Sequence, residues 1–149
     1  MSRKCDDWLT RIKAVERDYS AARFAIDRLW ESARSDPTVL RGVLDVRHLA
    51  QAGSGLEATY FIRLFAVFEG GLRDFWQVLK PGRTPRTEHL LDGLASARGI
   101  PNDLLVNTHA VRRCRNSLVH EQGEEIEPIP LATARGHLCK FFSRLPPTW

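Results

Sequence analysis

Hydrophobic residues recur along the first part of the chain with the spacing of a helix that packs against other helices. Between Asp6 and Ala33, the steps from one apolar position to the next alternate between four and three residues. This heptad spacing is typical of a helical seam that faces a neighbouring helix. The seam positions are Trp8, Ile12, Val15, Tyr19, Ala22, Ile26 and Leu29. We therefore expect a long first helix that ends at Asp36-Pro37, because the residue before a proline is pushed out of the helical region.

The rest of the chain also shows helical spacing, and no segment has the paired alternation of a β-hairpin. The further helical segments that we expect are 37–52, 56–79, 87–97, 101–122 and 131–145. The segment 56–79 is the most apolar and should form the centre of the core. Together these segments predict one all-α domain over 1–149, an up-and-down bundle of four or five helices.

Glycines and one threonine mark the expected ends of these segments. Gly53-Ser54-Gly55 should break the chain, Thr87 should cap a helix, and Gly99 and Gly123 should each follow a helix end. Gly70-Gly71 lies inside the most apolar segment, where glycine lowers helix stability. That pair allows either a close approach of another helix or a local kink, and the pattern does not decide between them.

Composition narrows the class of protein without identifying a function. The 149 residues are 43% apolar and carry a net charge of +4, which suits a polyanion such as RNA but equally an ordinary basic protein. No apolar run has the length of a membrane span or a signal peptide, so we expect a cytoplasmic protein with no membrane partner. The three cysteines are far apart and the histidines lack ligand spacing, so no metal site and no cofactor is expected.

The residues that suggest chemistry lie together at 112–120, with the sequence Arg-Arg-Cys-Arg-Asn-Ser-Leu-Val-His. Arg115 falls on the apolar side of its expected helix, where a guanidinium needs an acidic partner, a route to solvent or a bound anion. Asn116 and His120 are four residues apart and therefore neighbours, and Arg112 continues their row. On position alone, a solvated arginine and a surface histidine near a helix end are as reasonable as a phosphate-binding strip.

The stretch Arg115-Asn116-Ser117-Leu118-Val119-His120 resembles the signature of the HEPN (higher eukaryotes and prokaryotes nucleotide-binding) superfamily. The order of the expected helices is similar too, and 65–73 resembles the second main helix of that family, which often carries an acidic residue facing the motif. Glu69 would take that place and pair with Arg115. One position departs from the family: Gln122 stands where some members have a tyrosine that accepts a nucleotide, which argues against control by that modification.

The resemblance implies a metal-independent endoribonuclease. His120 would move a proton, Arg115 would stabilise charge on the reacting phosphate, and Asn116 would orient one of them. The products would be a 2′,3′-cyclic phosphate and a 5′-hydroxyl. The resemblance further implies a homodimer whose two motif helices face each other across a cleft. Candidate RNA contacts are Arg112, Arg113 and Lys13.

Two other functions stay open on the sequence. The chain is alternatively a non-catalytic HEPN domain that binds RNA or a nucleotide, or a helical protein-interaction subunit with a chance motif. The resemblance also points to a toxin or phage-defence effector, with an antitoxin or another defence-system protein as its partner. No residue identifies the RNA target.

Overall fold

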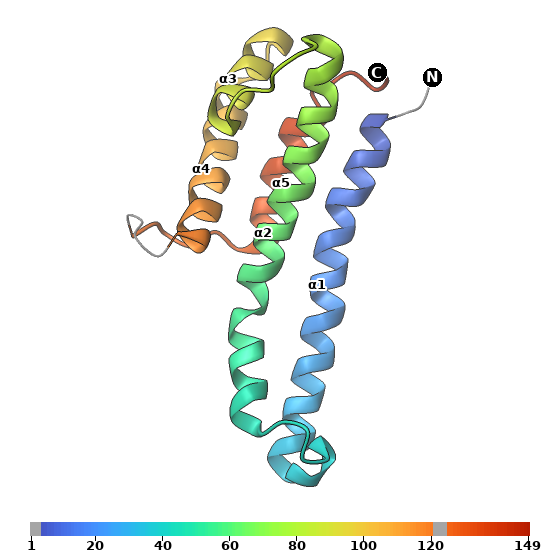
Figure 1. Cartoon of the computed structure of the whole chain (residues 1–149), viewed down its shortest axis with the longest axis vertical. Coiled ribbons are helices and arrows are strands. Elements are labelled where there is room, and N and C mark those ends of the chain that lie inside the picture. The colour runs from blue at the N-terminus through green and yellow to red at the C-terminus, as the bar shows by residue number, and fades with distance from the viewer. Residues whose placement is uncertain (1–3, 121–124) are drawn as a thin grey trace.

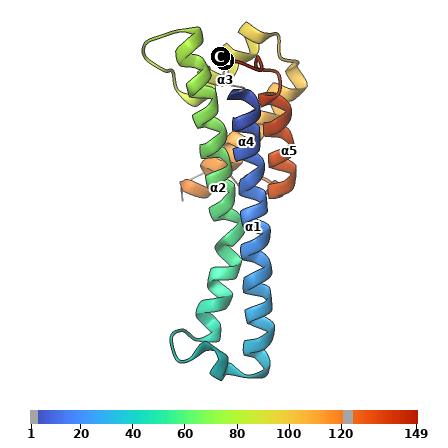
Figure 2. The same ribbon diagram turned by 90° about the vertical axis from the view of Figure 1, so that its right-hand side faces the viewer.

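The computed structural model describes residues 4–120 and 125–149, and the regular secondary structure of this described part is all helical (Figure 1). Its elements are α1 (Lys4–Ser35), the 3-10 turn η1 (Pro37–Leu40), α2 (Val46–Leu79), α3 (Thr87–Arg98), α4 (Asn102–Val119) and α5 (Leu131–Phe142). Helices α1 and α2 form a long antiparallel hairpin, and α3, α4 and α5 lie along one half of it (Figures 1 and 2). The expectation of an all-α bundle is thus confirmed over the described residues.

The main core lies where α1, α2, α3, α4 and α5 meet, and α2 contributes the largest share of its buried residues. Five of its large side chains are at most 2% exposed: Phe61, Leu64, Phe65, Phe68 and Leu72. The ring of Phe68 lies 6.0 Å from that of Phe141 and 6.1 Å from that of Phe142, both on α5. Burying a side chain of this size contributes about 1.5–3 kcal/mol, so this packing fixes α5 and α4 against the hairpin.

The other half of the hairpin is a two-helix extension that α4 and α5 do not cover (Figures 1 and 2). A separate small core of Ala33, Leu40 and Leu49 closes its tip. The predicted seam on α1 follows this division. Ile12 is fully buried in the main core, whereas Leu29 in the extension stays 37% exposed, because no third helix packs there.

The prediction that Gly53-Ser54-Gly55 breaks the chain is wrong, because α2 continues through it without interruption. Gly53 is buried against α1, and its carbonyl accepts a hydrogen bond of 2.8 Å from Arg23 Nη1. A Cβ at Gly53 would come within 2.9 Å of Arg23 Nη2. The glycine therefore leaves room for the Arg23 side chain, which reaches from α1 to the carbonyl of Gly53 on α2. The expected helix over 37–52 is instead η1 followed by the start of α2, which Asp45 caps by accepting from His48 N at 2.9 Å.

The remaining helix ends agree with the sequence in part. Gly99 adopts a left-handed conformation (φ 60°) after α3, as expected for a residue that ends a helix. Thr87 does not cap α3, because its hydroxyl points to Glu69 on α2. Helix α4 ends at Val119 and α5 at Phe142, each three residues before its predicted end. Gln122 and Gly123 lie outside the described residues.

The glycine pair inside α2 has a packing role, which gives a test of the core. A Cβ at Gly71 would lie 2.6 Å from Phe142 Cε2 and 3.0 Å from Trp8 Cδ2. Gly71→Ala should therefore lower the free energy of unfolding by about 1–3 kcal/mol through overpacking. Gly55→Ala in the same helix has open space and should raise that free energy by about 0.5–1 kcal/mol. Denaturant unfolding of both variants measures the difference, and equal effects would contradict the close contact.

Candidate functional site

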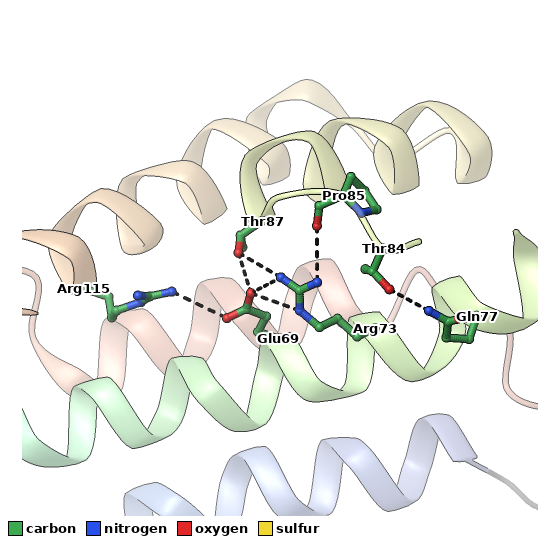
Figure 3. A network of polar contacts seen from close by, with 7 residues as sticks. All are labelled: Glu69, Arg73, Gln77, Thr84, Pro85, Thr87 and Arg115. Carbon is green, nitrogen blue, oxygen red and sulfur yellow. Dashed lines mark hydrogen bonds and ion pairs between the residues drawn. The ribbon is translucent and has the colours of Figure 1, made fainter. Parts of the chain in front are cut away.

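Glu69 on α2 stands at the centre of a polar network that joins three helices (Figure 3). Its Oε1 accepts from Arg73 Nη2 at 2.6 Å and Nε at 3.2 Å, and also from the hydroxyl of Thr87 on α3. Its other oxygen, Oε2, lies 3.5 Å from Nη2 of Arg115 on α4. The predicted pairing of Glu69 with Arg115 is therefore confirmed.

Arg115 is held loosely in comparison with Arg73. Its Cζ lies 4.8 Å from the centre of the Phe65 ring, a cation–π contact on the core side of α4. Its side chain remains 23% exposed, so solvent reaches the guanidinium. Two guanidinium groups share the single carboxylate of Glu69, which leaves this cluster with one positive charge. Such a cluster can bind an anion such as a phosphate.

The charge state of Glu69 follows from its surroundings. Burial by itself would raise the pKa of this carboxyl. The hydrogen bonds from Thr87 and Arg73, together with the charges of Arg73 and Arg115, outweigh burial and hold the pKa below its usual value. Glu69 is therefore ionised at neutral pH and stabilises the charged forms of both arginines.

The lowered pKa of Glu69 predicts a pH-dependent contribution to stability. This contribution is fully present above the pKa of an unfolded glutamate, about 4.3, and is lost as the pH falls through the lower folded pKa. Glu69→Gln should cost about 1.5–3 kcal/mol at pH 7, the usual range for hydrogen bonds to a charged group. In urea unfolding, the difference between wild type and variant should shrink at pH 3. A difference that stays constant between the two pH values would argue against an ionised Glu69.

His120 lies at the end of α4, one residue beyond the helix. Its backbone N–H donates to the carbonyl of Asn116 at 3.0 Å, and its side chain is exposed. Asn116 is half-buried one turn earlier. Within the described residues, no hydrogen bond or ion pair joins the side chains of His120 and Arg115. One chain therefore presents the histidine to solvent and the arginine to Glu69.

The three predicted RNA contacts fall in different surroundings. Arg112 is only 15% exposed and ties α4 to α3, with Nη2 3.6 Å from a Glu88 oxygen and Nε donating to His109 Nδ1 at 3.3 Å. Arg113 is exposed on α4. Lys13 lies on α1, on the opposite side of α2 and α5 from α4, beside Glu16 and Arg135 (Figure 1). Lys13 is thus not brought to the motif.

Two members of the network were missed from the sequence. The spacing of Glu69 and Arg73, four residues apart on one helix, is a signal that could have identified Arg73. Thr87 carries no such signal, because its role depends on where α3 lies on α2. These two residues, rather than the predicted basic ones, surround the carboxylate that pairs with Arg115.

A hollow of about 360 Å³ lies next to the motif, between α2, α4 and the segment that leads into α5. Ser117 and Leu118 of the motif line it together with Phe61 and Ile129. Glu57 stands at this hollow and accepts from the backbone N–H of Leu131 at 2.9 Å, which caps α5. One side of α4 thus contacts Glu69 through Arg115, and another side lines a mainly apolar hollow.

Over 4–120 and 125–149, no three His, Cys, Asp or Glu side chains are grouped so that they could hold a metal ion. No helix in those ranges is both long enough and apolar enough to cross a membrane. No family model, curated protein or solved structure matches the chain.

Proposed function

We propose that this chain is a HEPN-type endoribonuclease that cleaves RNA without a metal ion. The contact between Glu69 and Arg115 carries the proposal. The second main helix of the family that the motif resembles often carries an acidic residue opposite the motif arginine, and α2 has Glu69 there, 3.5 Å from Arg115. A chance motif on a solvated helix would not need a half-buried, ionised partner for its arginine.

The chemistry uses the nucleophile that RNA itself carries. The 2′-hydroxyl attacks the adjacent phosphorus, its proton passes to a base, and the P–O5′ bond breaks as the leaving oxygen gains a proton. His120 serves as acid or base at the exposed helix end. Arg115 stabilises the negative charge that develops on the phosphate oxygens, and Asn116 orients the phosphate or the imidazole. The products are a 2′,3′-cyclic phosphate and a 5′-hydroxyl, and no cofactor takes part.

A second copy of the chain completes the proposed site. One chain supplies a single histidine, which is exposed and, within the described residues, forms no ion pair or side-chain hydrogen bond with Arg115. Two chains would supply two copies of both groups to a shared cleft. Leu118 and Val119, which precede His120, are 43% and 47% exposed and offer apolar area for such a contact. Arg113 is a candidate RNA contact beside that cleft. A cytoplasmic toxin or phage-defence effector with an antitoxin or defence partner is the setting that we propose.

The decisive experiment compares two substrates in the presence of a metal chelator. Wild-type protein should cleave a mixed-sequence RNA and leave ends that carry a 2′,3′-cyclic phosphate, detected by mass spectrometry. The matching 2′-deoxy strand should remain intact, because it lacks the nucleophile. Cleavage that requires a divalent ion, or equal cleavage of both strands, would exclude this mechanism.

Within the described residues of one chain, no hydrogen bond or ion pair joins the side chains of Arg115 and His120. This favours a second candidate, a non-catalytic domain that binds RNA or a nucleotide. The positive cluster at Arg115 would then hold a phosphate without turnover. Binding of both strands with no product formed would favour this candidate. A monomer with affinity for neither strand would instead indicate a helical protein-interaction subunit.

A further inference from the structure

We infer that Thr87 and Arg73 are positioning residues that keep Glu69 from pairing with Arg115 through both of its carboxylate oxygens. Arg115 therefore retains N–H donors for an anion. The inference rests on the proposed function for its biological meaning, but its geometry stands on the contacts in Figure 3. Neither residue belongs to the motif, and both act through Glu69.

The two oxygens of Glu69 have different partners. Oε1 accepts from two nitrogens of Arg73 and from the Thr87 hydroxyl, whereas Oε2 faces only Nη2 of Arg115 among these groups. At 3.5 Å this last contact is longer than a normal hydrogen bond. The carboxylate is thus turned so that it meets Arg115 with one oxygen.

The position of Thr87 is itself fixed by the connection between α2 and α3. Arg73 Nη1 donates to the carbonyl of Pro85 at 3.2 Å. Gln77 Nε2 donates to the carbonyl of Gly82 at 3.1 Å and to Thr84 Oγ1 at 2.6 Å. Three carbonyl or hydroxyl groups of this connection are therefore held on α2, and the start of α3 is placed where Thr87 reaches Glu69 (Figure 3).

A free carboxylate and a guanidinium prefer to pair through two parallel hydrogen bonds. Without the bonds to Oε1, Glu69 is able to turn and present both oxygens to Arg115. Two N–H groups of Arg115 would then donate to Glu69, and fewer would remain to bind a phosphate. The bonds from Thr87 and Arg73 oppose that rotation.

The test measures how fast phenylglyoxal modifies Arg115, followed by mass spectrometry of its peptide. Thr87→Val keeps the side-chain shape but removes the hydroxyl, and it should slow modification of Arg115 by about 3- to 10-fold, the effect of one hydrogen bond. Thr87→Ser should restore the wild-type rate. Thr59→Val is the matched control and should leave the rate unchanged, because its hydroxyl donates to the Gly55 carbonyl within α2 and takes no part in this network. The modification rate of exposed Arg113 should also stay the same in every variant.

Loosened packing would act in the opposite direction, because it would expose Arg115 and speed its modification. Faster or unchanged modification in Thr87→Val therefore overturns the inference. If Thr87→Val does not fold, Arg73→Gln removes the other donors to Oε1, and it too should slow modification of Arg115.

Cleavage kinetics separate this inference from the proposed function. If RNA is the substrate, kcat should fall by about 3- to 10-fold in Thr87→Val with KM unchanged, since the loss concerns charge stabilisation in the transition state. Slowed modification together with a wild-type protein that cleaves no RNA supports the positioning role and removes the nuclease. If wild type cleaves RNA but Thr87→Val leaves the modification rate of Arg115 unaltered, the nuclease is supported and the positioning role is overturned.

Discussion

His120→Ala should lower the rate of RNA cleavage by about 100- to 10,000-fold, the usual contribution of a general acid or base. Among the side chains of the motif, the imidazole is the type that serves most often as a general acid or base. His120 lies beyond the end of α4, where its backbone N–H, which alanine retains, holds it to Asn116. The variant should therefore fold normally, with a free energy of unfolding within about 0.5 kcal/mol of wild type.

The measurement is kcat on a labelled RNA with chelator present, alongside thermal unfolding of each protein. His89→Ala is a matched control, because His89 is also an exposed histidine but lies on α3, outside the motif. Cleavage by this control should equal that of wild type. Undiminished cleavage by His120→Ala would remove the histidine from the mechanism.

Arg115→Ala should lower kcat by about 100- to 1,000-fold, the cost of removing one preorganised donor from a transition state that carries negative charge. Arg115→Lys should not restore the rate, because an ammonium lacks the planar fork of a guanidinium. Arg113→Ala serves as the control for general loss of positive charge on α4 and should mainly weaken RNA binding. Equal losses in the Arg113 and Arg115 variants would show that only net charge matters.

A mixture of the two inactive proteins tests the shared site that this mechanism requires. If Arg115 of one chain acts with His120 of another, a mixed dimer of the Arg115→Ala and His120→Ala chains keeps one intact site. After unfolding and refolding together, an equal mixture should recover about a quarter of the wild-type activity, since half of the dimers are mixed and each has one of two sites. No recovery would mean that one chain must supply both groups.

The sequence predicted the helices well because helical spacing is a local property. The apolar steps identified α1 and the part of α2 from Leu56 to its end, and Gly99 marked the end of α3. Gly53 misled because the same residue type serves chain breaks and close helix contacts, and only the position of Arg23 across the hairpin distinguishes them. A local pattern contains no information about that partner.

The candidate site, like the fold, was predictable from the sequence only in part. Arg115 was placed on the apolar side of its helix, and the resemblance supplied Glu69 as its partner, which the structure confirms. Thr87 could not be assigned, because its contact depends on how α3 lies on α2. Lys13 was grouped with the motif on charge alone, and charge does not reveal on which side of the bundle α1 lies.

The uncovered half of the hairpin gives the molecule two levels of local stability along one pair of helices. Its tip is closed by only three buried side chains, Ala33, Leu40 and Leu49, whereas the other half is closed by the phenylalanines of α2 and α5. Amide protons near the tip should therefore exchange with solvent through partial opening, while those beside Phe65 and Phe68 should exchange only when the whole domain unfolds. Fraying of the tip leaves the contact between Glu69 and Arg115 intact.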